Sequence, residues 1–424
     1  MNRQHTIIFI LLTLLLASCG DDRSSEYYAL TADNRWINQT MQKYYLWNDD
    51  LPEIEEKEYF GSPEDFIKKI VSKKALGGKG DKFTYIEDHR ETDQQPTRGN
   101  IDEESTYGID FELLTDPTGE TTHKLARILY TLPHSPAREA GLKRGDWISE
   151  MDGERITVNN YQLLRSGGPV TLTREKLIET EEETKWQEAG KIQMQASRPM
   201  ADNPFLLDSV YDIQGTKAAY LMYTGFRRKD GQYAKEMEQI FSRMKQYKPQ
   251  IMILDLRYNS GGYLSAASQL AAMTAPADAI GQPLYTLQYN KTSERESQTG
   301  IIEPKWKDYN IGAKILYIIT TGRTASASEM IINCLRPYYN ENLITVGQQT
   351  YGKPVAMEPF TNEAGTLILW PVTSIIYNKQ GKADYAGGIP ADIKAAEPFN
   401  LQPLGSSDDP MLRAIIDDIN PNHN

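Results

Sequence analysis

A serine at the start of an expected helix is the first feature of this chain that could carry out chemistry. Residues 324–331 read Thr-Ala-Ser-Ala-Ser-Glu-Met-Ile and follow an apolar run at 314–320. Ser326 could act as a nucleophile there. The same stretch, Ser326-Ala-Ser-Glu329, also has the spacing of a capping box, in which a serine and a glutamate satisfy orphan amides at a helix start. The stretch alone leaves both roles open.

A serine nucleophile needs a base within hydrogen-bond reach, most often a histidine. The histidines are at positions 5, 89, 123, 134 and 423, so residues 199–400 contain none. A Ser-His-Asp triad is therefore not expected. A lysine can replace histidine if burial lowers its pKa, and Lys353, in the turn-like stretch 350–354, is the candidate. No His-Glu-x-x-His or clustered Cys/His pattern indicates a zinc hydrolase.

Residues 199–400 alternate between strand and helix patterns. Residues 251–254 and 315–319 are continuous apolar runs of the kind buried in parallel sheets, and each precedes a glycine-bearing turn and a helical pattern. We expect an α/β domain. Ligands of such folds bind beyond the carboxyl ends of the strands, so the loops 255–262 and 321–328 lie where a site would form.

Residues 101–198 carry short apolar strands separated by turns, with one short helix that Ser135 caps and Pro136 begins. This part resembles a PDZ domain. Such domains bind extended chain ends by adding a strand to a sheet edge, while loop amides hold the terminal carboxylate. The resemblance places that loop at Tyr107, Gly108 and Ile109. A β-rich spacer without a ligand is the alternative.

The N-terminus predicts export and anchoring. Residues 1–19 combine a basic start, a short apolar core and Leu16-Ala-Ser-Cys19, which resembles the lipobox of bacterial lipoproteins. We expect Cys19 to be acylated and the exported protein to be anchored to a membrane, with the outer membrane expected, on its periplasmic or cell-surface side. Residues 20–100 predict a polar tether and a helical module, and residues 401–424 a C-terminal tail.

Composition limits the remaining classes. The chain has 424 residues, of which 39% are hydrophobic and 25% charged, as in ordinary globular proteins of several domains. Its net charge of -12 argues against a nucleic-acid partner. If Cys19 is lipidated, Cys334 has no disulfide partner, and its apolar neighbours indicate a buried packing residue.

Several motifs in order resemble the C-terminal processing peptidases, or tail-specific proteases. The motifs are Tyr44-Tyr-Leu-Trp47, Leu254-Asp-Leu-Arg-Tyr-Asn-Ser-Gly-Gly262, Thr324-Ala-Ser-Ala-Ser-Glu329, Tyr351-Gly-Lys353 and Gly387-Gly-Ile-Pro-Ala-Asp392. The resemblance implies a helical module, a PDZ domain and a crotonase-like α/β catalytic domain with a Ser-Lys dyad, Ser326 as nucleophile and Lys353 as base. Met357 stands where the family usually has a glutamine.

The same positions suggest how an oxyanion would be stabilised. The amide of Ala327 lies at a helix start, and Gly261 or Gly262 would supply a second amide. We therefore expect a lipid-anchored serine endopeptidase that cleaves unfolded or flexible polypeptides, with no metal or organic cofactor implied. Two alternatives remain, a peptide-binding lipoprotein without activity, which Met357 would favour, and a hydrolase of small esters or amides.

Overall fold

The computed structural model describes residues 24–90 and 105–420, so the predicted signal peptide and the lipidation site Cys19 lie outside the described residues. The chain forms two units, and each contains segments that are distant in the sequence. The first unit comprises Met1–Pro96, Tyr289–Arg295 and Met357–Ser374; the second comprises Thr97–Gln288, Glu296–Ala356 and Ile375–Asn424.

The first unit contains the predicted helical module. Its main helices are α2 (Ser24–Tyr44) and α3 (Pro63–Ile70), and Ser62 caps the latter by accepting from the Asp65 amide at 3.2 Å. A small antiparallel sheet completes the unit, in the order β1 (Tyr85–Asp88), β19 (Leu367–Trp370) and β18 (Phe360–Thr361). Two of its three strands therefore come from residues that the sequence analysis assigned to the α/β domain.

A six-stranded sheet forms the centre of the second unit. Its order is β10 (Phe205–Ile213), β11 (Thr216–Tyr223), β12 (Ile251–Asp255), β15 (Ile315–Thr320), β16 (Leu343–Gly347) and β21 (Ile393–Lys394). All neighbours from β11 to β21 are parallel, and β10 is antiparallel to β11. The apolar runs at 251–254 and 315–319 are thus adjacent parallel strands, which confirms the prediction of an α/β domain.

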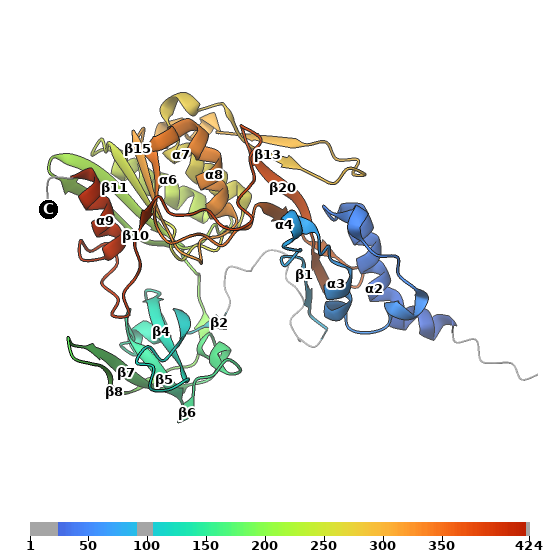
Figure 1. Ribbon diagram of the computed structural model, residues 1–424, viewed down its shortest axis with the longest axis horizontal. Helices are drawn as coiled ribbons and strands as arrows, with labels where there is room; N and C mark the ends of the chain where they lie inside the picture. The colour runs from blue at the N-terminus through green and yellow to red at the C-terminus, as the bar shows by residue number, and fades with distance from the viewer. Residues whose placement is uncertain (1–23, 91–104, 421–424) are drawn as a thin grey trace, which may run out of the picture. The chain divides into compact units, whose positions relative to one another are not determined.

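Helices cover both faces of this sheet. Figure 1 shows α6 (Gln232–Lys245), α7 (Leu264–Thr274) and α8 (Ala327–Tyr339) on one side and α9 (Pro410–Ile419) on the other. The segment predicted to be a C-terminal tail contains α9, whose Met411 and Ile415 are fully buried in the core with Ile253 and Ile319. Their burial supplies about 1.5–3 kcal/mol for each side chain.

A second sheet contains β14 (Gln298–Ile301), β13 (Pro283–Gln288), β20 (Val372–Asn378) and β17 (Val355–Met357), in that order. The strand β17 begins directly after the turn that carries Lys353.

In the described residues, no helix is both long enough and apolar enough to cross a membrane.

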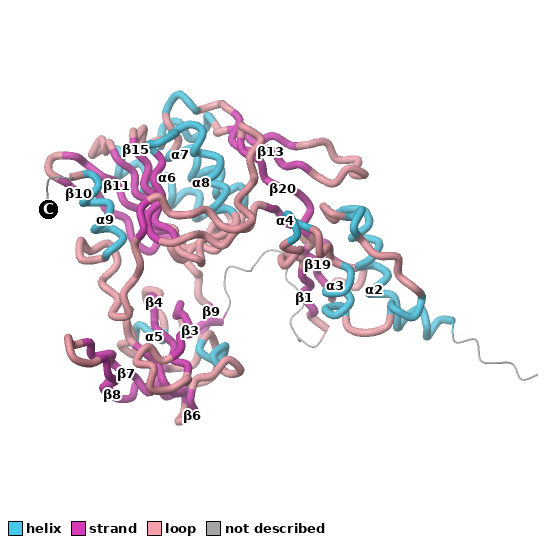
Figure 2. The backbone as a smooth tube through the Cα atoms, viewed as in Figure 1, coloured by secondary structure: helices cyan, strands magenta, loops and turns pink. Residues whose placement is uncertain are grey.

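Residues 105–199 form the β-rich region, which Figure 2 shows as almost wholly strand and loop. Its main sheet has the order β3 (Ile109–Thr115), β4 (Lys124–Thr131), β5 (Trp147–Met151), β7 (Val170–Glu179) and β8 (Thr184–Met194). Ser135 accepts from the Arg138 amide at 3.1 Å and caps the short helix α5 (Pro136–Glu139), as predicted. The strand β3 lies at one edge of this sheet.

Candidate active site

Ser326 lies between the end of β15 and the start of α8, in a backbone conformation that few residues adopt. Its φ is 56° and its ψ is -114°. A positive φ in a residue other than glycine stores strain, and such residues cluster at functional sites. Ser326 is partly exposed, whereas Ala325 and Ala327 on either side of it are buried. The chain is therefore bent so that this serine, and not its neighbours, faces solvent.

The loop that carries Ser326 is fastened to the loop that follows β12. The hydroxyl of Thr324 donates to the carbonyl of Leu256 at 2.9 Å. The carbonyl of Asn259 accepts from the Ala325 amide at 3.1 Å and from the Ser328 hydroxyl at 3.0 Å. The two loops beyond β12 and β15 thus meet at the carboxyl edge of the sheet. Ser328, the second serine of the motif, is buried and serves this junction.

Glu329 joins the loop of Ser326 to the turn that contains Lys353. Its Oε2 accepts from the Ser326 amide and from the Lys353 amide, each at 2.8 Å. Its Oε1 accepts from the Thr350 hydroxyl at 2.5 Å and from the Gly352 amide at 2.6 Å. One carboxylate oxygen therefore holds the backbone nitrogens of Ser326 and Lys353 within twice 2.8 Å of each other.

The environment of Glu329 combines burial with four hydrogen-bond donors. The side chain is fully buried. Burial raises the pKa of its carboxyl, and the four donors oppose that shift by favouring the charged form. The carboxylate also lies in the first turn of α8, where the helix dipole favours a negative charge. The capping box that the sequence predicted is present at this helix start, and its glutamate does more than cap.

The loop 255–262, which we call the glycine loop, packs directly against Ser326. A Cβ placed on Gly261 would lie 2.8 Å from Ser326 Cβ and 3.2 Å from the Ala327 nitrogen. The Gly261 amide donates to Asn259 Oδ1 at 2.9 Å. Gly262 forms a parallel bridge with Phe226. In this bridge the Phe226 amide donates to the Gly261 carbonyl, and the Tyr263 amide donates to the Phe226 carbonyl. The amide of Gly262 therefore points away from Phe226.

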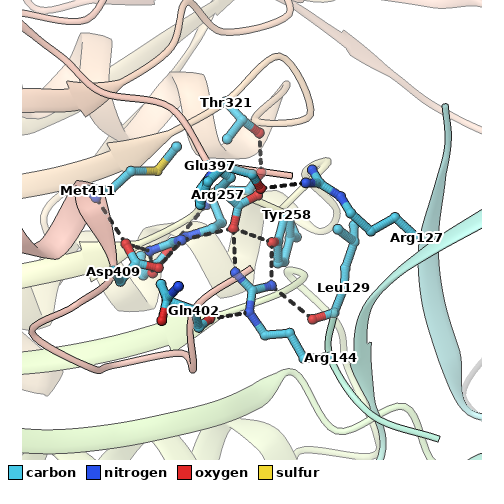
Figure 3. A network of polar contacts seen from close by, with 12 residues as sticks. Arg127, Leu129, Arg144, Arg257, Tyr258, Thr321, Glu397, Gln402, Asp409 and Met411 are labelled. Atoms are coloured by element: carbon cyan, nitrogen blue, oxygen red, sulfur yellow. Dashed lines mark hydrogen bonds and ion pairs between the residues drawn. The ribbon is translucent and has the colours of Figure 1, made fainter. Parts of the chain in front are cut away.

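A buried ionic network is centred on Arg257 of the glycine loop (Figure 3). Arg257 is fully buried and binds both oxygens of Asp255 at 2.7 and 3.0 Å. It also contacts Asp409 at 2.6 Å and Glu397 at 3.0 Å. Asp409 caps α9 by accepting from the Met411 amide at 3.0 Å. The network thus ties the C-terminal helix to the loop beside Ser326.

Glu397 also connects the loop that follows β12 in the six-stranded sheet to the β-rich region. It accepts from Arg144 at 2.6 Å and from the Tyr258 hydroxyl at 2.6 Å (Figure 3). We call residues 395–405 the strap, because this segment runs from β21 towards α9 and contacts the β-rich region on the way. Arg127 donates to the strap carbonyl of Pro398 at 2.6 Å, and Arg144 donates to that of Gln402 at 2.7 Å.

The predicted carboxylate loop of the β-rich region uses much of its backbone internally. The Tyr107 amide donates to the Arg165 carbonyl at 3.0 Å, and the Gly108 amide donates to Thr106 Oγ1 at 2.9 Å. Gly108 has a φ of 74°, and a Cβ there would lie 2.3 Å from Ser135 Cβ. Only glycine fits this turn. A peptide carboxylate that bound here would have to replace these internal acceptors or use other donors.

The structure thus brings together Ser326, Ala327, Gly261, Gly262 and Lys353 in one unit around the carboxyl edge of the sheet. The residues Tyr107, Gly108 and Ile109 lie in the β-rich region of the same unit. Cys334 is fully buried in α8, and burial raises the pKa of its thiol, as expected of a packing residue.

Sequence reasoning missed the residues that hold the site together. Glu329 was interpreted only as half of a capping box, and that pattern was the one signal in the sequence that pointed to it. Glu397 and Asp409 gave no signal, because their partners are distant in the chain and no periodicity marks an ion pair. Arg323, shortly before Ser326, was also overlooked; it binds both oxygens of Asp110 at 2.7 Å.

Comparisons with known proteins agree with this arrangement. A model named "Peptidase family S41" matches residues 217–395, and one named "Peptidase S41 N-terminal domain" matches residues 32–85. A carboxyl-terminal-processing protease of Synechocystis sp. is 24% identical, over 83% of this chain and 80% of its own. That of Picosynechococcus sp. is 23% identical, over 73% of this chain and 69% of its own.

Solved structures extend the likeness. A crystal structure of an S41 protease candidate from Bacteroides fragilis has a TM-score of 0.77 at 30% identity, and covers 92% of this chain and 98% of its own. The photosystem II D1 C-terminal processing protease shares the fold, with a TM-score of 0.51 at 17% identity. These findings define a serine-type peptidase. The chain belongs to peptidase family S41 and, within it, to the C-terminal processing peptidases, which confirms the resemblance seen in the sequence.

Proposed function

We propose that this protein is a lipid-anchored endopeptidase that cleaves unfolded or flexible polypeptides through a Ser326–Lys353 dyad, on a crotonase-like catalytic domain. The observation that carries the proposal is the Glu329 carboxylate, which holds the backbones of Ser326 and Lys353 together at 2.8 Å each. A helix cap alone would not need the second contact. The strained backbone of Ser326 gives independent support.

In this mechanism Lys353 Nζ accepts the proton of Ser326 as Oγ attacks the scissile carbonyl carbon. The amides of Ala327 and Gly262 donate to the oxyanion, since the Gly261 amide already serves Asn259. Lys353 then gives the proton to the leaving amine, which departs and leaves an acyl ester on Ser326. Water attacks that ester and loses a proton to Lys353; Lys353 then returns this proton to Ser326 Oγ as the ester bond breaks, which releases the new carboxyl terminus and regenerates the serine.

The β-rich region, as a PDZ-like domain, would hold a C-terminal segment of the substrate by strand addition at β3, with the turn at Tyr107, Gly108 and Ile109 near its terminal carboxylate. The edge position of β3 supports this role. Acylation of Cys19 would anchor the protein to a membrane after export. The alternative function is a peptide-binding lipoprotein without activity, and Met357 is the residue that favours it.

The test uses a soluble form without residues 1–19 and an unstructured, end-labelled protein. We expect cleavage by the parent, a loss of at least about a thousandfold in Ser326→Ala and Lys353→Ala, and most activity retained in Ser328→Ala. Circular dichroism and thermal unfolding confirm that each variant folds. A parent that binds the labelled chain without cutting it would establish the alternative, and equal loss in Ser328→Ala would contradict the assignment of Ser326.

A further inference from the structure

Two side chains of the protein already bind the free edge of β3 at Phe111. Phe111 lies opposite Ile128 of β4. Both backbone groups of Ile128 bond in the other direction, since its amide donates to the Asp146 carbonyl at 2.9 Å and its carbonyl accepts from the Gly145 amide at 2.8 Å. The two residues therefore form a pair without mutual hydrogen bonds, and the amide and carbonyl of Phe111 point out of the sheet at its free edge.

Two charged side chains satisfy both of these edge groups. The Phe111 amide donates to Asp110 Oδ1 at 2.9 Å, and Arg323 Nη1 donates to the Phe111 carbonyl at 3.1 Å. Arg323 Nη2 also binds both oxygens of Asp110 at 2.7 Å. The pair thus occupies the amide and the carbonyl that a newly added strand would use. The register of the pairing between β3 and β4 is irregular between Asp110 and Phe111.

We propose that Asp110 and Arg323 form a removable cap on the peptide-binding edge, and that a substrate polypeptide must displace Arg323 from Phe111 in order to add as a strand to β3. This inference rests on the proposed function, because it assumes that β3 is the docking strand. Arg323 belongs to the loop of Ser326, so the catalytic domain supplies the group that competes with the substrate.

The cap is suited to exchange. The Arg323 side chain is 37% exposed, although that of Asp110 is only 14% exposed, so water reaches the arginine side of this ion pair. The guanidinium also lies 5.5 Å from the centre of the Tyr258 ring, a contact that does not use the Phe111 carbonyl. A cavity of about 260 Å³ lies beside it, lined in part by Glu112, Gly322 and Gln348. The released side chain therefore has room to move without entering solvent fully.

Removing the cap should strengthen peptide binding, which is the opposite of what removal of a contact residue does. The test uses a fluorescein-labelled unstructured peptide with a free carboxyl terminus, and the protein in a Ser326→Ala background that prevents cleavage. Fluorescence anisotropy measures its Kd. We expect Arg323→Ala and Asp110→Ala each to lower the Kd about three- to tenfold, because binding no longer breaks one partly exposed ion pair and one hydrogen bond.

Arg243→Ala is the matched control, because Arg243 pairs with Asp208 at 3.2 Å on the surface of the same unit. Its Kd should stay at the parent value. An unchanged or higher Kd in both cap variants would overturn the proposal. If the parent binds no peptide, binding by both cap variants but not by the control would support the cap, and binding by none would refute it. Cleavage by the Ser326 protein tests the proposed function separately, so the two failures are distinguishable.

Discussion

The substitution Glu329→Gln would test whether one carboxylate assembles the catalytic pair. Glutamine has nearly the same shape, but only one of its two terminal atoms accepts hydrogen bonds. In the wild-type protein four donors converge on Glu329, and three of them are backbone amides that cannot reverse their role. The hydroxyl of Thr350 can turn and accept instead.

The cost follows from counting the donors that glutamine leaves without an acceptor. Its oxygen can keep the amides of Ser326 and Lys353, while its NH₂ group faces Thr350 and the Gly352 amide. The Gly352 amide then has no acceptor in a buried place, which costs about 1–3 kcal/mol of unfolding free energy. Gly352 precedes Lys353 directly, so a shift there displaces the proposed base, Lys353. We expect kcat to fall about ten- to a hundredfold.

Urea unfolding and steady-state cleavage measure the two effects in the same preparation. The pH profile adds a test, since burial raises the pKa of Glu329. Protonation puts a hydrogen on an acceptor oxygen, so parent activity should fall on the acid side from a pH above the ordinary glutamate value of about 4.3. The variant should lack that limb. Glu236→Gln, whose carboxylate accepts from the Asn203 side chain, is the control. Full activity in Glu329→Gln would refute the reasoning.

Two further predictions concern the supports of the site. Gly261→Ala places a Cβ 2.8 Å from Ser326 Cβ and 3.0 Å from the Ala325 carbonyl oxygen at a φ of +108°, so cleavage should fall more than about a hundredfold; near-normal cleavage by the folded variant would contradict this. Burial alone would raise the pKa of Glu397, but Arg257 and Arg144 hold it below the ordinary value. Its contribution to stability is therefore present above about pH 4.3 and is lost as the pH falls through the lowered pKa. Urea titrations across that range should show a smaller pH dependence in Glu397→Gln, and equal slopes would count against the network.

Local patterns in the sequence were enough to predict central elements of the α/β domain. The apolar runs became β12 and β15, and the helical pattern at 234–247 became α6. The pairing of β1 with β19 was not predictable, because residues 85–88 meet residues 367–370 only through the tertiary structure. Neither stretch carries a signal that names its partner.

The candidate site shows the same division. Ser326 and Lys353 were proposed from residue type and motif order, since each sits in a short stretch with its own pattern. The contacts of Glu329 with Thr350 and Gly352 depend on β16 leading back beside β15, which only the sheet order establishes. The sequence analysis treated residues 401–424 as a tail, yet Asp409 is 1% exposed and binds Arg257. An ion pair between distant residues has no period that a sequence would reveal.

The strap also sets an order of events during synthesis. Arg144 and Arg257 are made before Glu397 and Asp409, because ribosomes build the chain from its N-terminus. Arg257 can pair with Asp255 at once, but Arg144 meets Glu397, and Arg257 meets Asp409, only after the strap and α9 have been made. A nascent copy that already contains Ser326 and Lys353 therefore still lacks the carboxylates that complete this network.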